Sequence, residues 1–314
     1  MDRKPVSVKS YANIAIVKYW GKADAERMIP STSSISLTLE NMYTETKLSF
    51  LPEDATSDVM YIDDELQGEK ETTKASKVLD LFRTNPNQHV KIETWNNMPT
   101  AAGLSSSSSG LSALVKAANE LFQVGKTQSE LAQIAKFASG SSSRSFFGPL
   151  AAWDKDSGEV YPVETDLKLA MIMLVLTDQK KPVSSRDGMK LCTETSTSFP
   201  EWIKQSEQDY KDMLGYLKAN DFQAVGELTE ANALRMHQTT STANPPFSYL
   251  TDASYQAMDK VKAFRASGEQ CYFTMDAGPN VKVLCLEEDL DRLADHFRKD
   301  YQVIVSRTKE LPDA

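Results

Sequence analysis

The chain has 314 residues, 40% of them hydrophobic, which is enough apolar material for one large or two moderate domains. Its formal net charge is -9, and nucleic-acid-binding proteins usually carry a basic balance, so we expect no nucleic-acid partner. No apolar run is long enough to span a bilayer, and residues 1–9 lack the apolar core of a signal peptide. These features also predict that the chain has no membrane partner.

The cysteines are odd in number and have no CxxC spacing: Cys192, Cys271 and Cys285. This pattern predicts a reducing, cytoplasmic location and argues against a disulfide framework or a zinc site. The three histidines lie far apart in the sequence. Histidine metal sites and Ser-His-Asp chemistry are therefore not favoured.

The first half of the chain is rich in strand patterns. Alternating β-branched, aromatic and aliphatic residues predict strands at residues 6–10, 14–19, 34–40, 47–51, 59–63 and 90–95. Apolar residues at helical spacing predict helices at residues 72–82 and 106–122. A third helix is predicted from Thr127 to about residue 139, because Glu130 completes a capping box with Thr127.

The second half changes character after a continuous apolar strand at residues 169–177. Three long helices are predicted at residues 199–219, 222–239 and 251–267, before a final strand-strand-helix-strand run at residues 270–276, 281–286, 288–299 and 302–307. We place a domain boundary near residues 177–182. No Pro/Ser-rich linker occurs there, so the two halves should pack tightly.

The segment PTAAGLSSSSSG, residues 99–110, lies between a predicted strand and a predicted helix. Small residues let the backbone approach an anion, and a helix N-terminus offers unpaired N–H groups and a partial positive charge. Five consecutive hydroxyls add donors that can also bind Mg²⁺. No GK[ST] follows, so this is not a Walker motif. The segment is either a phosphate-binding loop, which five serines favour, or a serine-capped helix start.

Two further segments combine hydroxyls with cations. In SGSSSRSFFG, Arg144 can hold a carboxylate or phosphate through two parallel hydrogen bonds, and the alternative is a turn with a solvated arginine. In KKPVSSR, residues 180–186, two lysines, two serines and an arginine surround the start of another helix.

The remaining two segments end predicted strands. NIAIVKYWGK ends in a cluster that includes Lys18 and Lys22, which alternation places on one side if the strand is unbroken. The alternative is an edge strand with its lysines in solvent. In TMDAGPNV, Asp276 ends a strand just before Gly278 and Pro279. A carboxylate there is either a turn former or a catalytic group facing a cleft.

Together the five segments resemble the mevalonate diphosphate decarboxylase family, within the wider galactokinase, homoserine kinase, mevalonate kinase and phosphomevalonate kinase (GHMP) superfamily. NIAIVKYWGK, PTAAGLSSSSSG, SGSSSRS, SSRDGM and MDAGPNVK occur in the family's order over nearly the whole chain. The resemblance implies an α+β, two-domain GHMP-kinase-like fold with the active site in the interdomain cleft. It implies an N-terminal ATP-binding domain at residues 1–179, similar to domain 2 of ribosomal protein S5, and a GHMP-kinase-type domain at residues 180–314. It also implies ATP, Mg²⁺ and a homodimer.

The resemblance also implies roles for single residues. Asp276 matches the aspartate that approaches the substrate's 3-hydroxyl, Arg144 matches the arginine that binds the C1 carboxylate, and Lys22 is the third catalytic candidate. The implied substrate-binding residues are Asn13, Lys18, Tyr19, Lys22, Ser139, Ser141, Arg144 and Arg186. The implied ATP-binding residues are Ala102, Gly103, Leu104, Ser105, Ser106, Ser107, Ser108, Ser109, Lys181 and Ser185. The Mg²⁺ ligands stay open because we identify no matching glutamate.

The implied reaction converts mevalonate 5-diphosphate and ATP to isopentenyl diphosphate, CO2, ADP and phosphate, in the mevalonate pathway of isoprenoid biosynthesis and lipid metabolism. Cations gathered in the motifs of an acidic chain suit such a polyanionic substrate. One alternative is a small-molecule kinase of the superfamily, whose phosphate loop more typically reads Gly-Leu-Gly-Ser-Ser. The other is a non-catalytic nucleotide-binding protein, against which Asp276, Arg144 and Lys22 argue together.

Overall fold

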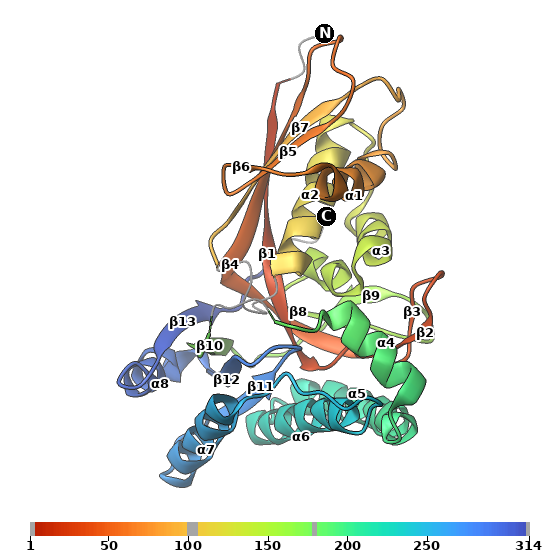
Figure 1. The fold of residues 1–314 in the computed structure, drawn as a ribbon. Helices are drawn as coiled ribbons and strands as arrows, with labels where there is room; N and C mark the ends of the chain where they lie inside the picture. Colours follow the sequence, from red (N-terminus) through yellow and green to blue (C-terminus); the bar gives the residue numbers. More distant parts are fainter. Residues whose placement is uncertain (1–3, 99–105, 178–180, 312–314) are drawn as a thin grey trace.

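The computed structural model describes residues 4–98, 106–177 and 181–311. Figure 1 shows two parts, an upper one built on long strands and a lower one floored by helices. Strands β1 (Val6–Val17) and β4 (Ser34–Phe50) run down the upper part and reach the lower one. Within the described ranges, no helix is long and apolar enough to cross a membrane.

The upper sheet follows the strand order β6-β5-β7-β4-β8-β9, and β1 pairs antiparallel with β4. Its remaining strands are β5 (Val59–Ile62), β6 (Glu65–Leu66), β7 (Val90–Asn96), β8 (Leu150–Trp153) and β9 (Val160–Pro162). The strands predicted at residues 34–40 and 47–51 are one strand, β4. The residues between them were not recognised as strand because two of the three buried positions there are polar, Thr44 and Thr46. Their hydroxyls bond Ser109 at 2.7 Å and Thr94 at 2.8 Å, which satisfies them inside the fold.

Helices cover one face of the upper sheet: α1 (Glu69–Leu79), α2 (Ser106–Leu121) and α3 (Gln128–Ala138), followed by the 3-10 helix η1 (Gly140–Phe146). The capping box predicted for α3 is confirmed, because Thr127 and Glu130 exchange both side chain-to-backbone bonds. This fixes where α3 begins, and therefore where η1 follows it.

The second sheet follows the order β11-β12-β10-β13 with antiparallel pairing throughout. Its strands are β10 (Leu169–Val175), β11 (Tyr272–Met275), β12 (Val281–Leu286) and β13 (Gln302–Arg307). Its helices are α4 (Ser185–Thr195), α5 (Phe199–Lys218), α6 (Phe222–Ser241), α7 (Asp252–Ala266) and α8 (Leu290–Phe297), with the short η2 (Glu287–Asp289) before α8. Two short strands, β2 (Lys22–Asp24) and β3 (Ile29–Pro30), form a separate hairpin. The division at residues 179 and 180 stays a prediction, and β10 pairs within this second sheet.

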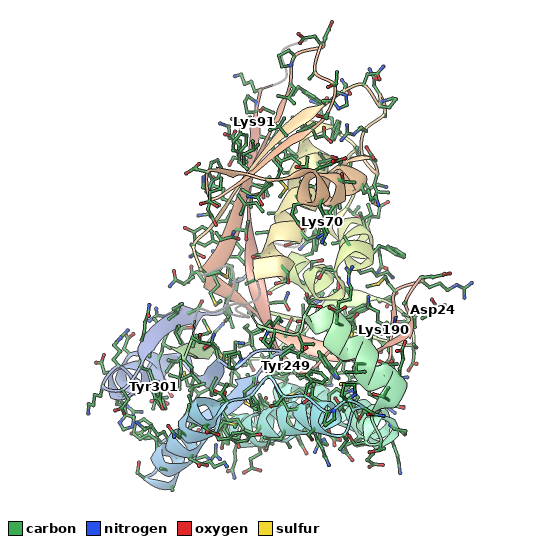
Figure 2. All side chains as sticks on the ribbon, viewed as in Figure 1. Asp24, Lys70, Lys91, Lys190, Tyr249 and Tyr301 are labelled. Carbon is green, nitrogen blue, oxygen red and sulfur yellow. The ribbon has the colours of Figure 1, made fainter. Side chains whose placement is uncertain are left out.

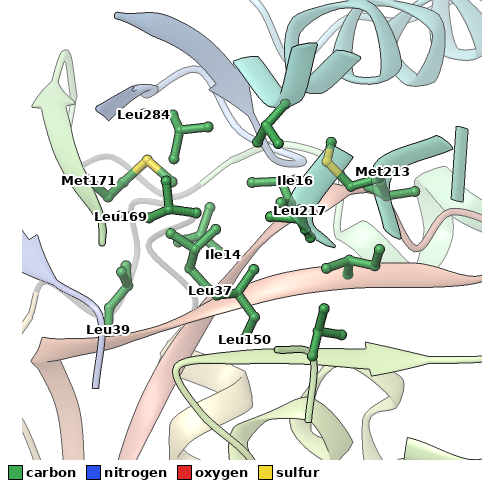
Figure 3. Close-up of a cluster of buried hydrophobic side chains, with 14 of the residues drawn as sticks. Ile14, Ile16, Leu37, Leu39, Leu150, Leu169, Met171, Met213, Leu217 and Leu284 are labelled. Carbon is green, nitrogen blue, oxygen red and sulfur yellow. The ribbon is translucent and has the colours of Figure 1, made fainter. Parts of the chain in front are cut away.

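One apolar core joins the two sheets, as the absence of a linker predicted. Figure 3 shows Leu37 of the upper sheet, Leu169 and Leu284 of the second sheet, and Met213 and Leu217 of α5 in this cluster. All five are essentially inaccessible to solvent. Since burying a leucine-sized side chain contributes about 1.5–3 kcal/mol, this cluster holds the two parts in a fixed relation.

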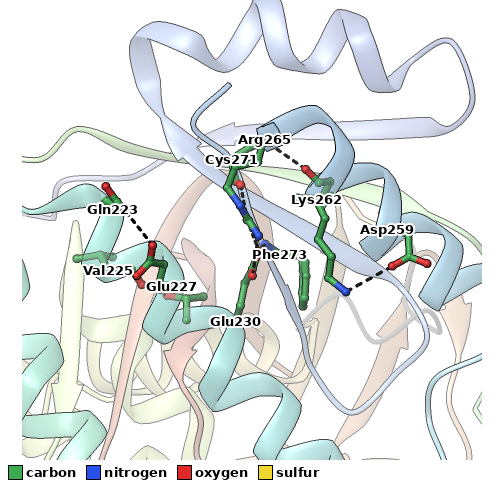
Figure 4. A network of polar contacts seen from close by, with 11 residues as sticks. Gln223, Val225, Glu227, Glu230, Asp259, Lys262, Arg265, Cys271 and Phe273 are labelled. Atoms are coloured by element: carbon green, nitrogen blue, oxygen red, sulfur yellow. Dashed lines mark hydrogen bonds and ion pairs between the residues drawn. The ribbon is translucent and has the colours of Figure 1, made fainter. Parts of the chain in front are cut away.

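A polar network anchors the strand that leads to Asp276. Glu230 of α6 accepts two hydrogen bonds from Arg265 of α7, at 2.6 and 3.1 Å, and one from the backbone N–H of Phe273 at 3.0 Å (Figure 4). Arg265 also donates to the carbonyl of Cys271 at 2.9 Å. Strand β11 is therefore tied to two helices before it reaches the site.

A second polar contact positions the start of α4. Tyr249, labelled in Figure 2, donates from its hydroxyl to the carbonyl of Ser184 at 3.0 Å. Ser184 is the N-cap of α4, and its side chain accepts from the N–H of Asp187. The segment that carries Lys181 and Ser185 is thereby attached to the lower part of the molecule.

Candidate active site

A cavity of about 400 Å³ opens where four segments meet: the end of β1, the start of η1, the residues before α4 and the turn after β11. Residues from both parts of the molecule line it. The lining residues include Asn13, Lys18, Tyr19, Trp20, Lys22, Met28, Ser107, Ser139, Gly140, Ser141, Arg144, Lys181, Ser185, Arg186, Met189, Met236, Asp276 and Ala277. Every segment in which the sequence predicted chemistry therefore reaches this one cavity.

The charge of the cavity is opposite to that of the whole chain. Among the described lining residues, five side chains are cationic and one is a carboxylate, Asp276. The chain as a whole carries a net charge of -9. Such a concentration of cations in an acidic protein suits a ligand with several negative charges.

Two lysines hold the carboxylate of Asp276. Lys18 Nζ lies 2.8 Å from Oδ1, and Lys282 Nζ lies 2.9 Å from Oδ2. Burial raises the pKa of Asp276, but the charges and hydrogen bonds of the two lysines outweigh burial and hold this pKa well below its usual range. Asp276 is therefore ionised at neutral pH. Its side chain forms two ion pairs, and its catalytic role stays a prediction.

Lys18 is buried, with a side-chain exposure of 2%. Burial lowers its pKa to about 8, although Asp276 opposes that effect. Its ammonium group also donates to the carbonyl of Ala15 at 2.7 Å. Its backbone N–H donates to Asn232 of α6 at 2.8 Å, and Asn232 in turn donates to Asp209 at 2.8 Å. The alternative that placed these lysines in solvent is wrong for Lys18.

Lys18 and Lys22 reach the cavity from different elements. The condition of an unbroken strand, under which alternation would place both on one side, is not met, because β1 ends at Val17 and Lys22 begins β2. Between them Gly21 has φ +112, and a Cβ there would lie 2.5 Å from the ring of Phe199. This tight turn requires glycine, and it directs both lysines to the cavity.

Arg144 is buried and has neutral partners. Its guanidinium donates to Ser34 at 2.6 Å, to Ser36 at 2.9 Å and to Asn13 at 3.3 Å, and the residue is 2% exposed. No carboxylate of the described chain forms an ion pair with it. Burial lowers its pKa to about 10, so it is still charged at neutral pH. An uncompensated buried cation that lines a cavity is a ready partner for an anionic ligand, and the solvated-turn alternative is wrong.

The aromatic wall depends on a second glycine. The ring of Tyr19 packs on Trp153 with centroids 5.1 Å apart, and a Cβ on Gly140 would lie 2.9 Å from both rings. Burial raises the pKa of Tyr19 to about 12, so its hydroxyl remains a donor. Ser139 and Ser141, on either side of Gly140, have hydroxyls 3.3 Å apart. This edge of the cavity therefore presents three hydroxyl groups.

Lys181 and Ser185 lie together beside the Asp276 turn. Lys181 donates to Ser185 at 2.6 Å and to the carbonyl of Ala277 at 2.7 Å. Burial and then the charge of Arg186 lower the pKa of Lys22. All four side chains line the cavity.

The serine segment is only partly seen at the cavity. Ala102, Gly103, Leu104 and Ser105 lie outside the described residues, and Ser106 begins α2. Ser107 is exposed and lines the cavity. Ser108 and Ser109 are buried and do not line the cavity, and Ser109 bonds Thr44. The roles of these serines in nucleotide binding stay predictions.

Sequence reasoning missed Lys282 and the two serines that hold Arg144. The signal for Lys282 was a single lysine inside the apolar strand β12, a position where a charge is rarely buried without a partner. Ser34 and Ser36 are alternate residues of β4 and so share one face of it. Nothing in the sequence links that face to Arg144, which lies about a hundred residues later.

The described residues contain no group of three or more His, Cys, Asp or Glu side chains that could hold a metal ion. The carboxylate in the cavity, Asp276, already has a lysine on each oxygen. These residues therefore do not form a Mg²⁺ site by themselves. Mg²⁺ typically binds few protein ligands and relies on substrate phosphates and water.

Comparison with known proteins is consistent with this geometry. Two family models match the chain: a diphosphomevalonate decarboxylase-like N-terminal domain at residues 10–161 and a mevalonate 5-diphosphate decarboxylase C-terminal domain at residues 171–312. The diphosphomevalonate decarboxylase of Candida albicans is 31% identical over 94% of this chain and 88% of its own.

Solved structures agree with the family models. The mevalonate pyrophosphate decarboxylase of Streptococcus pyogenes is 67% identical, with a TM-score of 0.97 over 100% of this chain and 99% of its own. A second structure, described as MDDEF in complex with MVAPP, AMPPCP and magnesium, is 40% identical, with a TM-score of 0.89 over 98% of each chain. The fold is thus the two-domain α+β fold of these decarboxylases, and the chain belongs to the mevalonate diphosphate decarboxylase family.

Proposed function

We propose that this chain decarboxylates mevalonate 5-diphosphate at the expense of ATP, giving isopentenyl diphosphate, CO2, ADP and phosphate. The observation that carries the proposal is the pairing, in one cationic cavity, of an ionised carboxylate at Asp276 with a buried arginine, Arg144, that has no carboxylate partner among the described residues. The carboxylate of Asp276 is suited to orient the substrate hydroxyl that is phosphorylated. The guanidinium of Arg144 is suited to bind the substrate carboxylate that is lost as CO2. Family membership supports both assignments.

In this proposal the substrate lies along the cavity with its C1 carboxylate on Arg144, where Asn13 lines the same wall. The hydroxyls of Tyr19, Ser139 and Ser141, together with Lys22 and Arg186, bind the diphosphate. ATP approaches from the other side, with its phosphates at the serine segment that leads into α2 and at Lys181 and Ser185. Each assigned group within the described ranges but outside the serine segment lines the cavity, and Ser107 of that segment does so too.

The first step is phosphoryl transfer to the 3-hydroxyl. A tertiary alcohol is a poor leaving group, so it must be phosphorylated before it departs. Asp276 accepts the hydrogen bond of the hydroxyl and orients its oxygen toward the γ-phosphorus of ATP. Because the pKa of Asp276 is held low, it is a weak base, and it takes the proton late, as the new O–P bond forms. Lys18 and Lys181 offset the charge that develops nearby.

The second step is elimination. The C3–O bond breaks, and its electron pair leaves with phosphate. The C1–C2 bond then breaks, CO2 departs, and those electrons form the C2–C3 double bond. Arg144 keeps the carboxylate in place until this bond breaks, and the cations of the cavity stabilise the departing phosphate. Burial of the site protects the electron-deficient carbon from water.

Mg²⁺ enters this scheme as part of the substrate MgATP. The magnesium in the related MDDEF complex, bound together with an ATP analogue, supports this role. The ion would neutralise part of the phosphate charge, while the hydroxyls of the serine segment and of Ser139 and Ser141 face the phosphates. No step described here requires a protein carboxylate on the metal.

The test is a product analysis with purified protein, ATP, Mg²⁺ and mevalonate 5-diphosphate. We expect isopentenyl diphosphate, CO2, ADP and phosphate in equal amounts. Accumulation of a phosphorylated acid without CO2 would instead assign the chain to the kinases of the superfamily. If neither turnover nor ADP formation is detected, the result would support a non-catalytic nucleotide-binding protein.

Two further properties are proposed with the function. We infer a homodimer, which sedimentation equilibrium of the full chain tests directly. We also infer a cytoplasmic location, which is supported by three cysteines that are buried and unpaired: Cys192, Cys271 and Cys285. Fractionation of the source cells, followed by detection with an antibody to the chain, tests the location.

A further inference from the structure

Lys282 is a buried lysine in the middle of an otherwise apolar strand. It is the second residue of β12, has a side-chain exposure of 1%, and is not among the residues that line the cavity. Its Cα pairs with Thr274 of β11 on one side and Met173 of β10 on the other. The backbone of Lys282 is therefore held between two strands, and its ammonium group has little freedom.

Lys282 forms an ion pair with Asp276, and this contact indicates a role for the buried lysine. Its Nζ lies 2.9 Å from Oδ2 of Asp276, on the oxygen that Lys18 does not occupy. A buried ion pair seldom stabilises a fold more than well-packed apolar side chains of similar volume would. Fold stability alone is therefore a weak explanation for a lysine at position 282. The contact of Lys282 with Asp276 is a stronger explanation.

The two lysines differ in their access to the substrate. Lys18 lines the cavity, so an anionic substrate can draw it away from Asp276, whereas Lys282 lies behind the carboxylate. The substrates of the proposed reaction bring a carboxylate, a diphosphate and a triphosphate close to Asp276. Like charges so near favour protonation of a carboxylate. A cation that the substrate cannot reach opposes that effect.

We propose that Lys282 is a positioning residue: it holds Oδ2 of Asp276 from behind, so that the carboxylate stays ionised and in one orientation while anionic substrates fill the cavity. Its role in turnover rests on the proposed function above, whereas its effect on Asp276 does not. Among the described residues, the charged and titratable groups that act on Asp276 from the surrounding elements include Lys18, Lys282, Lys181, Arg144 and His237.

His237 does not take over this task. Its ring is buried on α6, and its pKa is lowered to about 4, first by burial and then by the charge of Lys18. It is therefore neutral where the enzyme would work and supplies no positive charge. Arg144 and Lys181 act on Asp276 through space, and no hydrogen bond from either to this carboxylate occurs among the described residues. Lys282 is thus the cation that contacts Asp276 without lining the cavity.

The kinetic test compares Lys282→Met, Lys282→Arg and a matched control, Thr274→Val. Thr274 lies opposite Lys282 in the sheet, is buried, and its hydroxyl has no hydrogen-bond partner within the described ranges. We expect Lys282→Met to lower kcat about tenfold or more and to change KM little, because it alters the reacting group and not the binding groups. Lys282→Arg should recover part of kcat, and Thr274→Val should resemble the wild type.

The pH dependence of kcat distinguishes a positioning role of Lys282 from a merely structural one. The ratio of variant to wild-type kcat, measured between about pH 5 and pH 8, cancels the titration of substrate phosphates, which both enzymes share. In Lys282→Met, Asp276 loses one of the two lysines that contact it among the described residues, so this ratio should fall as the pH falls. A ratio that is independent of pH, or an equal loss in Thr274→Val, would contradict the proposal.

A measurement on the protein without substrate tests the effect of Lys282 on Asp276 independently of the proposed reaction. Carboxyl carbon NMR of protein labelled at aspartate, with the Asp276 signal assigned by its absence in Asp276→Asn, reports the titration of this group directly. In the wild type the signal should stay that of the ionised form down to the lowest pH at which the protein is folded. In Lys282→Met its midpoint should move upward. An unmoved signal would overturn the proposal, whatever reaction the enzyme catalyses.

Discussion

Lys181 donates from Nζ to the backbone carbonyl of Ala277 at 2.7 Å, and so joins the segment before α4 to the residue that follows Asp276. Its second bond, to Ser185, lies on the same short segment. Burial lowers the pKa of Lys181, while Asp276 raises it. A phosphate that drew Lys181 toward itself would therefore also act on the turn that holds the carboxylate of Asp276.

For that reason we expect Lys181→Met to lower the rate of ADP formation in a single turnover by about 10²-fold, the usual effect of removing one electrostatic stabiliser. Mevalonate diphosphate binding, measured by calorimetry without nucleotide, should change little. Lys260→Met is a suitable control, since Lys260 pairs with Asp300 on the surface at 2.8 Å. Equal rates in wild type and Lys181→Met would remove Lys181 from the nucleotide site.

Arg144→Gln should keep the fold but lose most of kcat/KM. Loss of a guanidinium from a bound carboxylate costs about 2–5 kcal/mol, and the serines that now bond Arg144 can bond the amide. The matched control is Arg83→Gln, because Arg83 is also buried but pairs with Asp58 at 2.6 Å, away from the cavity. We expect Arg83→Gln to lower Tm and spare kcat/KM. The opposite pattern would show that Arg144 serves stability and not the substrate.

The environment of Lys116 leads to a prediction of how the free energy of unfolding depends on pH. It is largely buried on α2, its ammonium donates to Ser10 at 3.1 Å and to the carbonyl of Ser145 at 3.2 Å, and no carboxylate of the described chain pairs with it. Burial lowers its pKa to about 8 from 10.5. Between these two values Lys116 binds more protons in the unfolded chain than in the folded one, so its contribution to the free energy of unfolding rises with pH there.

Lys116→Met should remove this rise. The gain in the wild type is on the order of 3 kcal/mol, from a pKa difference of about 2.5 at 1.36 kcal/mol each. Urea unfolding of both proteins at pH 8 and pH 10 isolates the contribution of this one group, because the other titrating groups are shared. If the difference between the two proteins is the same at both pH values, Lys116 is not the group responsible.

Much of the second half of the fold follows from local patterns. The strands at residues 281–286 and 302–307 were predicted with the bounds that the structure has, because short segments rich in valine and other apolar residues, bounded by turns, leave few alternatives. The long helices α5 and α6 were predicted within two residues at each end, since both have a strong start signal before a phenylalanine. Propensity and periodicity are sufficient where burial follows them.

The site was harder to predict, because its contacts cross the chain. The motifs identified Lys18 and Asp276, but their salt bridge joins residues 258 positions apart, and no local pattern specifies such a pairing. The η1 segment was missed because serines fill most of its buried positions, and β8 was missed because it is short and has alanines at its two central buried positions. Strand β9 has three residues, of which only Val160 is buried, which is too short for a strand pattern. The burial of η1 and β8 is set by packing against other elements and not by their own hydrophobicity.

Asp276→Asn tests the central group, and the structure makes the expectation sharper. Turn chemistry alone suggests that asparagine is tolerated there. However, the change leaves Lys18 and Lys282 without their carboxylate, and breaking a buried ion pair in this way costs about 3–5 kcal/mol. We therefore expect a lower Tm, part of which Asp276→Asn combined with Lys282→Met should restore without restoring activity.

The activity of Asp276→Asn should fall by at least about 10²-fold, the lower end of the usual contribution of a general base. The control is Asp58→Asn, which also breaks a buried ion pair, that with Arg83, but lies outside the cavity and should lose stability and keep kcat. Rapid-quench measurement should place the loss in ADP formation, because the amide carries no charge and cannot accept the hydroxyl proton. If ADP forms at the wild-type rate while CO2 release is slow, Asp276 acts in the elimination step, and the order of events proposed here is wrong.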